Sequence, residues 1–263
     1  MGLFGKLFEK KECAICGGEI GLLGNRKLED GNMCKKCAAK LSPWFSDRRH
    51  STVEEIEQQL AYRAQNQEEL RNFRPGRRIG EAYEMIVEER GGVPFRFVVA
   101  NSSDYMEENA DLIAFQDVSA CSIDISESKR ELKYRNDNNE MVSYNPPRYE
   151  YSYDFYVEMT IENNPYFDEL RFKLNSFSVD IEPQHLGLGQ LFRGNRDFDP
   201  STNPQYRNFK KMCDEIEELV EAGRRGAPAE APAAAAAAAP KFCPNCGAPV
   251  SGGKFCGNCG SKL

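Results

Sequence analysis

Apolar and polar residues alternate strictly along one long segment of the chain. From Tyr149 to Ile161 the odd positions hold Tyr, Phe, Val, Met or Ile, and the even positions between them are mostly Glu, Ser, Asp or Thr. A period of two residues is typical of a β-strand with one buried face. We therefore predict that Phe155 and its odd-numbered neighbours line a core, whereas Glu158 faces solvent.

The alternation continues after a break at residues 163–165, but it changes phase. Apolar residues occupy even positions from Leu170 to Leu174 and odd positions from Phe177 to Ile181. A shift by one residue indicates a β-bulge. We expect this segment to pair with residues 149–161 as a long, bent hairpin.

The remaining pattern completes a mainly-β domain. Residues 204–222 show helical spacing, with one apolar face that includes Phe209 and Ile216. About seven antiparallel strands followed by this helix suggest a barrel or sandwich closed by a C-terminal α-helix. The strand count and order resemble those of bacterial pleckstrin-homology-like domains. The further strands are predicted at residues 83–89, 94–100, 112–116, 118–126 and 131–135.

Residues 51–72 are expected to form a connecting helix. Ser51 or Thr52 provides an N-cap, and Glu54 or Glu55 follows three residues later, as a capping box requires. The apolar stripe is thin and the rest of the segment is Glu, Gln and Arg, so we expect a solvated helix. That stripe comprises Val53, Ile56, Leu60 and Ala64.

The cysteines add a second kind of constraint. The chain has 263 residues, and neither a membrane-spanning run nor a secretory signal in residues 1–10 is apparent. We therefore expect a cytoplasmic protein with reduced thiols. Cys121 and Cys213 stand alone and are expected to act as small buried hydrophobes. The other eight cysteines form Cys-x-x-Cys pairs at Cys13/Cys16, Cys34/Cys37, Cys243/Cys246 and Cys256/Cys259.

The spacing of these pairs predicts two zinc sites. Seventeen residues separate the pairs of the first quartet, within the range of known zinc sites, and nine separate those of the second. Four thiolates fill a tetrahedral zinc shell, so both ions would be structural, giving two Zn²⁺ per chain. Iron binding or a redox dithiol remains the alternative for the first quartet.

Both quartets resemble known modules. Residues 12–50, including the run Leu41-Ser42-Pro43-Trp44-Phe45, look like a bacterial zinc-ribbon family of unknown function whose members carry this module at the N-terminus. Some members continue into a β-rich domain. This resemblance implies a metal-binding module and no activity. The second quartet is similar to the small zinc ribbons found at the ends of many bacterial and archaeal proteins.

These observations divide the chain into six parts. Leu3, Phe4, Leu7 and Phe8 fall on one helical face, which suits contact with a membrane surface, a partner or the protein's own body. The parts are an amphipathic tail (1–11), the first zinc module (12–50), the connecting helix and linker (51–78), the β-rich domain with its helix (79–224), an Ala/Pro tether (225–240) and the second zinc ribbon (241–263).

The sequence favours binding over catalysis. His50 and His185 lack the motif of an activated nucleophile, so we expect no catalytic residues and no enzyme. We expect an adaptor or scaffold that docks protein partners. Nucleic-acid binding is an alternative, but residues 79–185 hold 22 acidic and 9 basic side chains, which repel polyanions. Lipid binding through the pleckstrin-like domain is a further alternative. The cations that nucleic acid would use, near Trp44 and Phe45, are Lys35, Lys36, Lys40, Arg48 and Arg49.

Overall fold

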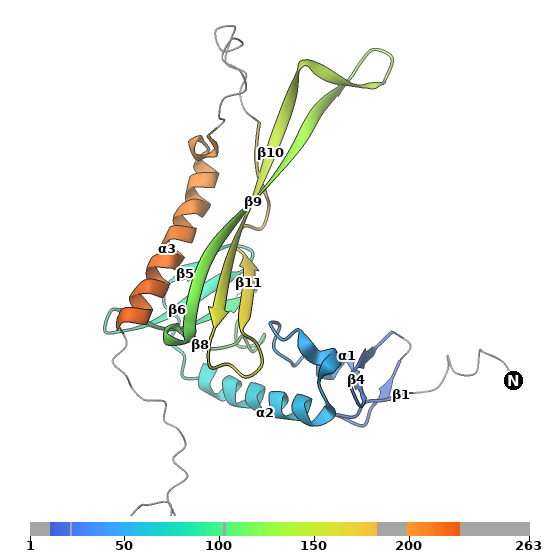
Figure 1. Ribbon diagram of the computed structural model, residues 1–263, viewed down its shortest axis with the longest axis vertical. Coiled ribbons are helices and arrows are strands. Elements are labelled where there is room, and N and C mark those ends of the chain that lie inside the picture. Colours follow the sequence, from blue (N-terminus) through green and yellow to red (C-terminus); the bar gives the residue numbers. More distant parts are fainter. Residues whose placement is uncertain (1–10, 22, 102–103, 183–198, 227–263) are drawn as a thin grey trace, which may run out of the picture. The chain divides into compact units, whose positions relative to one another are not determined.

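The computed structural model describes residues 11–21, 23–101, 104–182 and 199–226 (Figure 1). The chain divides into two units, residues 1–226 and 227–263, and all described residues belong to the first. The amphipathic tail up to residue 10, His185 and nearly all of the tether lie outside the described residues. So does the second quartet, comprising Cys243, Cys246, Cys256 and Cys259.

The N-terminal module consists of two small antiparallel ribbons. Strand β1 (Lys11–Glu12) pairs with β2 (Glu19–Ile20), and β3 (Asn25–Lys27) pairs with β4 (Asn32–Cys34). Helix α1 (Lys35–Ala38) follows β4 directly, and the short helix η2 (Asp47–His50) comes next. The module has a small apolar core of its own, formed around Leu28, Met33 and Ile56.

Helix α2 (Val53–Leu70) begins as the sequence predicts. The Thr52 hydroxyl accepts a hydrogen bond from the Glu55 backbone, and the Glu55 carboxylate accepts one from the Thr52 backbone. The prediction that this helix is solvated is wrong, because one face is fully buried. Its apolar ends enclose a polar middle, and the buried residues are Ile56, Gln59, Arg63, Asn66 and Leu70.

The β-rich part contains two four-stranded antiparallel sheets. The first has the order β5-β6-β7-β8 and comprises β5 (Arg78–Ile79), β6 (Glu84–Arg90), β7 (Val93–Ala100) and β8 (Ile113–Ala114). Short helix η3 (Phe115–Asp117) leads from this sheet into the second one. In the second sheet, β10 (Met141–Ile161) pairs with β9 (Val118–Arg135), β11 (Glu169–Lys173) and β12 (Val179–Ile181).

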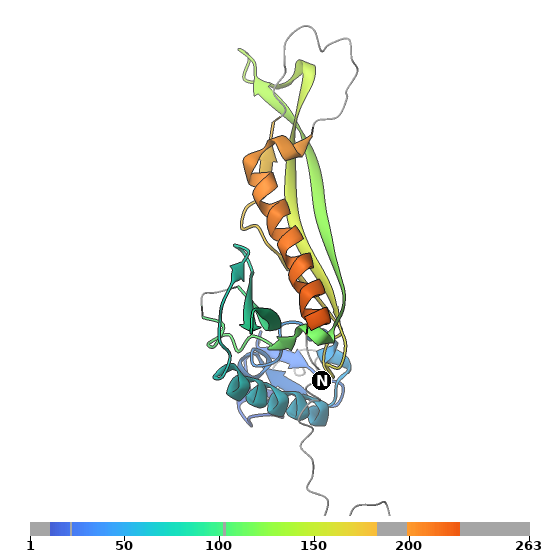
Figure 2. The ribbon, with the colours of Figure 1, turned by 90° about the vertical axis from the view of Figure 1, so that its left-hand side faces the viewer.

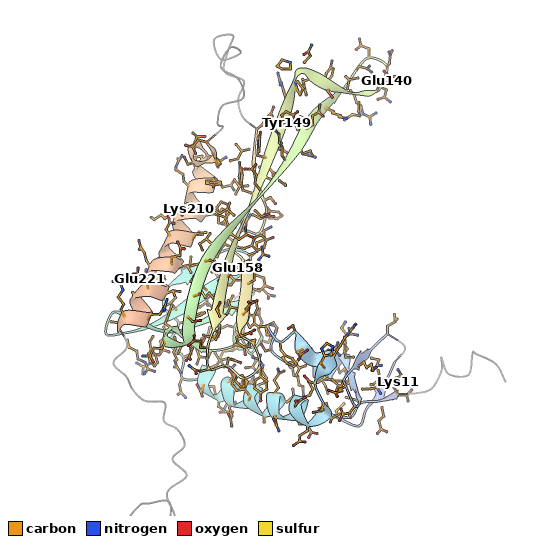
Figure 3. All side chains as sticks on the ribbon, in the orientation of Figure 1. Lys11, Glu140, Tyr149, Glu158, Lys210 and Glu221 are labelled. Atoms are coloured by element: carbon orange, nitrogen blue, oxygen red, sulfur yellow. The ribbon has the colours of Figure 1, made fainter. Side chains whose placement is uncertain are left out.

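The longest hairpin is formed by β9 and β10. Sequence analysis predicted two strands where the structure has the single strand β9, whose pairing with β10 is shifted between Ser143 and Arg148. The distal half of this hairpin, where Figure 3 labels Glu140 and Tyr149, projects beyond the other strands. Most of its residues are exposed, so it adds little to the core.

The predicted pairing of residues 149–161 with the following segment is confirmed. Strand β10 pairs with β11 through Val157 and Phe172 and with β12 through Tyr153 and Val179. The phase change falls between β11 and β12, where Asn175 is completely buried. The Asn175 side chain accepts a hydrogen bond from the Phe155 backbone at 2.9 Å and donates one to the Phe177 carbonyl at 2.8 Å. The Phe177 side chain is exposed rather than buried.

Asp154 on β10 lies beside the same turn. Its carboxylate accepts hydrogen bonds from Lys173 and Ser178, each at 2.8 Å. Burial opposes ionisation of Asp154, but the hydrogen bonds from Lys173, Ser178 and Asn175 outweigh it and lower the pKa of this carboxyl. The ionised form of Asp154 therefore stabilises the fold.

Helix α3 (Pro204–Gly226) completes the core, preceded by the short helix η4 (Pro200–Thr202). It packs against β7, β9 and β10, and Figure 2 shows it running along the hairpin. Phe155 is fully buried against Phe209 of α3, with ring centroids 5.4 Å apart. The predicted mainly-β fold with a C-terminal helix is thus confirmed. The described strands form no closed barrel, and the pleckstrin-like architecture stays a prediction.

Candidate metal centre

The first Cys-x-x-Cys pair lies in a tight turn between β1 and β2. The backbone N–H of Cys13 donates to the carbonyl of Gly18 at 2.9 Å, and Gly17 donates back to Cys13 at 2.8 Å. Gly17 has a φ of +68°, a conformation that glycine adopts without steric cost. This turn places the Cys13 and Cys16 thiols on one side of the chain.

The second pair lies where β4 passes into α1. Cys34 caps the helix, because its thiol accepts a hydrogen bond from the backbone of Cys37. The backbone N–H of Cys34 in turn donates to the Cys13 sulfur at 3.2 Å. The hydrogen bond from Cys34 to Cys13 therefore joins the two turns, and hydrogen bonds of this kind to sulfur stabilise thiolates.

The four sulfur atoms converge. The Sγ atoms of Cys13, Cys16, Cys34 and Cys37 all lie within 4.8 Å of one another, and those of Cys16 and Cys34 are 3.9 Å apart. A tetrahedral site with Zn–S bonds of about 2.3 Å has sulfur atoms separated by about 3.8 Å. The cluster therefore fits a four-thiolate zinc ion with little rearrangement.

The pKa values of Cys13 and Cys37 indicate that the four thiols need a cation in order to ionise together. Burial opposes ionisation of Cys13, but hydrogen bonds from Cys34, Cys16 and Ile15 lower its pKa to about 6. For Cys37, burial and then the neighbouring thiols raise the pKa to about 12. Four thiolates cannot share this space without a cation, and a divalent metal ion supplies the charge that lets all four ionise.

The four thiols would fill the coordination shell of a metal ion, although not all of them are buried. Cys13 and Cys37 are buried, Cys34 is half-buried and Cys16 is exposed. Four protein ligands leave no position for water or substrate on a tetrahedral zinc ion, so a metal bound here would be structural. The described part of residues 11–59 thus contains one complete set of four candidate zinc ligands. The predicted second site lies outside the described residues.

The other titratable candidates do not join this cluster. Cys213 is completely buried, and burial raises the pKa of its thiol to about 12. Burial and then Glu217 likewise raise the pKa of Cys121 to about 12. The prediction of a buried packing residue is confirmed for Cys213, whereas Cys121 is half-buried and packs against the edge of the core. His50 lies on the surface, where its ring contacts the Asp47 carboxylate at 2.6 Å.

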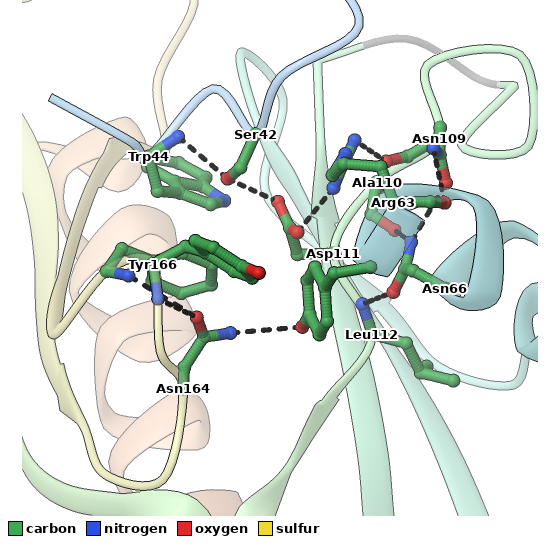
Figure 4. Close-up of polar contacts among 12 residues, drawn as sticks. Ser42, Trp44, Arg63, Asn66, Asn109, Ala110, Asp111, Leu112, Asn164 and Tyr166 are labelled. Atoms are coloured by element: carbon green, nitrogen blue, oxygen red, sulfur yellow. Dashed lines mark hydrogen bonds and ion pairs between the residues drawn. The ribbon is translucent and has the colours of Figure 1, made fainter. Parts of the chain in front are cut away.

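A buried polar network joins the metal-binding module to the β-rich part (Figure 4). Arg63 of α2 forms an ion pair with Asp111, and both side chains are almost completely buried. The Arg63 guanidinium also donates to the carbonyl of Lys40 at 3.3 Å, and Ser42 donates to Asp111 at 2.8 Å. The Asn66 side chain, on the same helix, donates a hydrogen bond to the Ala110 carbonyl. Burial raises the pKa of Asp111, whereas Arg63 and Ser42 oppose that shift.

Aromatic contacts reinforce the same junction. Trp44 of the module lies against Tyr83, with ring centroids 6.3 Å apart. Tyr62 of α2 packs on Tyr166 at 5.1 Å, and its hydroxyl accepts a hydrogen bond from Asn164. Sequence analysis missed this junction. The signal that could have indicated it is the spacing of Gln59, Arg63 and Asn66 on one face of the helix.

Comparison with known proteins identifies the N-terminal module alone. Residues 11–59 match a family described as a domain of unknown function, DUF4428. This match covers the four clustered cysteines and the start of α2. No curated protein and no solved structure matches the chain at a significant level. The chain is thus similar to this family over the metal-binding module, consistent with an N-terminal zinc-ribbon-like module.

Proposed function

We propose that this protein is a non-enzymatic, zinc-binding adaptor that docks protein partners. The observation that carries the proposal is the closed set of four thiols, Cys13, Cys16, Cys34 and Cys37. A full tetrahedral shell offers no site for catalysis but can hold a small module in a fixed shape. The module's own apolar core is small, so the metal would supply much of its folding free energy.

The junction at Arg63 and Asp111 supports a scaffolding role. A module joined to its neighbour through buried hydrogen bonds presents its surface in a defined orientation. We further propose that Cys243, Cys246, Cys256 and Cys259 hold a second structural zinc ion. In that arrangement residues 225–240 would tether a second docking module to the described part, giving the adaptor two points of attachment.

Two alternatives are less well supported. Cations around Arg48 favour nucleic-acid binding, but the acidic β-rich part disfavours a long polyanion. Lipid binding would need free cations in the β6–β7 loop. Instead, Arg90 at the end of β6 and Arg96 within β7 both contact the buried carboxylate of Glu88. None of the helices in the described part is both long and apolar enough to span a bilayer.

Affinity purification of the zinc-loaded full chain from its native extract tests the proposal. We expect a protein to be retained in a stoichiometric ratio, and we expect its loss on Cys16→Ser/Cys34→Ser substitution. The variant Cys121→Ser, which leaves both quartets intact, is the matched control. Retention of nucleic acid in place of protein, or equal retention by all three proteins, would contradict the adaptor function.

A further inference from the structure

The surface of the metal-binding module contains two adjoining hollows with a strongly cationic lining. The first has a volume of about 780 Å³ and is lined by Arg26, Lys27, Arg48, Arg49 and His50, with Glu29 as a carboxylate at its wall. The second, of about 360 Å³, shares Arg26 and Arg48 with the first. Because they share these two residues, the two hollows adjoin, and we call them together the cationic groove.

The cations of this groove have no acidic partners within the described chain. None of the Lys and Arg side chains in residues 11–50 forms an ion pair with a described carboxylate, and Asp47 is paired with His50. In the β-rich part, by contrast, Arg77, Arg96 and Arg171 each contact two carboxylates. The difference shows that the groove holds unneutralised positive charge, whereas the β-rich part neutralises much of its own.

The fold holds the guanidinium groups of the groove close together. Arg48 donates to the carbonyl of Lys27 at 2.5 Å, and Arg26 donates to the carbonyl of Asn25 at 3.2 Å. Partial burial and then the charges of Arg49 and Arg26 lower the pKa of Arg48. These groups repel one another, and a bound anion would relieve that repulsion.

The lining of the second hollow is less cationic and partly apolar. Besides Arg26, Arg48 and Lys35 it contains Leu41 and Phe45, together with two alanines and two serines. A ligand that fills both hollows must therefore present negative charge at one end and an apolar group next to it. Leu23, which is 94% exposed, adds a further apolar side chain close to Arg26.

We propose that the cationic groove binds an acidic segment of a protein partner in which Asp or Glu residues stand beside apolar side chains. Guanidinium groups form paired, charge-assisted hydrogen bonds with carboxylates. Single-stranded nucleic acid fits less well, because it needs exposed aromatic rings on which bases stack. Of the two nearby rings, Trp44 packs against Tyr83, and Phe45 is half-buried against the module's own core. This inference rests on the proposed adaptor function and names the chemistry of one partner.

Fluorescence anisotropy of the zinc-loaded full chain tests the groove directly. The probe is a short fluorescein-labelled peptide in which Asp and Glu alternate with Leu and Phe. Its amide counterpart, with Asn and Gln in place of the acids, and a thymidine oligonucleotide serve as comparison ligands. We expect the acidic peptide to bind at physiological salt and the amide peptide to bind at least about tenfold more weakly.

Substitutions distinguish binding at the cationic groove from a general effect of the chain's net charge. Arg26→Gln/Arg49→Gln should weaken binding of the acidic peptide by about tenfold or more. The control Arg74→Gln/Lys211→Gln removes two exposed cations elsewhere and should change the affinity by less than about twofold. Arg49→Glu alone serves as a second variant, because Arg49 is exposed and makes no described hydrogen bond. Zinc content and Trp44 fluorescence verify that each variant is folded.

Equal weakening by the two double variants, or tighter binding of the oligonucleotide than of the peptide, would overturn the proposal. The outcome also separates it from the adaptor function. If peptide binding fails while a partner is still retained in a zinc-dependent manner, the adaptor uses another surface. If both fail, the adaptor function falls as well.

Discussion

The buried ion pair between Arg63 and Asp111 provides the most demanding test of this structure. The two side chains are 3% and 0% exposed, so neither charge has water as an alternative partner. Replacing Arg63 by Met keeps most of the apolar stem and removes the guanidinium. Asp111 would then retain only Ser42 as a side-chain partner, and the Lys40 carbonyl would lose a donor.

The expected cost is large. Removing one partner of a buried ion pair costs about 3–5 kcal/mol, because the other charge stays buried without compensation. That is a substantial share of the 5–15 kcal/mol that stabilise a typical domain. Arg71→Met is the matched control on the same helix, where Arg71 pairs with Glu68 and both side chains are more than 60% exposed. It should cost no more than about 0.5 kcal/mol.

Urea unfolding of the zinc-loaded chain measures both variants. Trp44 is the only tryptophan of the chain and lies at the junction, so its fluorescence reports on the contact with Tyr83. The double variant Arg63→Met/Asp111→Leu should lose less free energy of unfolding than the sum of the single variants. If Arg63→Met costs under about 1 kcal/mol, the ion pair is not buried as described and the junction has been misassigned.

Three further predictions concern the core, the metal and pH. Phe155→Ala should cost about 3–5 kcal/mol in urea unfolding, because it leaves a cavity beneath α3. Glu158→Ala, whose side chain is 44% exposed and pairs with Arg171 at the surface, should cost no more than about 0.5 kcal/mol. Similar losses for both variants would contradict the strand register. Elemental analysis should find about two zinc ions in the full chain and about one in Cys16→Ser/Cys34→Ser, and iron in their place would contradict a zinc site. Asp154→Asn should destabilise the fold near neutral pH but progressively less as the pH falls below about 4, because a lowered folded-state pKa means that only the ionised form of Asp154 stabilises the fold. Urea unfolding of Asp154→Asn and the unsubstituted chain near neutral pH and below about pH 4 measures this loss of stability. The same loss at both pH values would contradict the hydrogen bonds to Asp154.

Short-range patterns in the sequence predicted the parts of the structure that local geometry decides. The alternation around Phe155 predicted strand β10 because its buried face is apolar and its other face is polar. The capping box at Thr52 predicted the start of α2, since both hydrogen bonds close within four residues. The spacing of the first cysteine quartet predicted the metal-binding cluster because each Cys-x-x-Cys turn brings two thiols together within four residues, and one tetrahedral ion takes two such turns.

The length of the β9–β10 hairpin could not be predicted in this way. Residues 131–135 were predicted as a strand, but residues 127–130 and 141–148 on either side are mostly exposed, so no alternation of buried apolar and exposed polar residues marks them as strand. Their conformation follows from hydrogen bonds between the two strands, for example where Tyr134 lies opposite Val142. Backbone pairing of this kind depends on a partner far along the chain and leaves no local signature.

The buried face of α2 was hidden for a different reason. A hydrophobic pattern treats Gln59, Arg63 and Asn66 as solvated, yet all three are buried. The partners of Arg63 and Asn66 come from other parts of the chain, whereas the Gln59 amide is buried without a hydrogen-bond partner among the described residues. The Lys40 carbonyl, which accepts from Arg63, and the Ser42 hydroxyl, which donates to Asp111, belong to the segment that follows the cysteine cluster. In the proposed zinc-bound form, folding of that small module depends on its metal. Loss of the metal would therefore leave Arg63 and Asp111 buried with fewer partners, so the free energy of zinc binding should stabilise the β-rich part as well as the module itself.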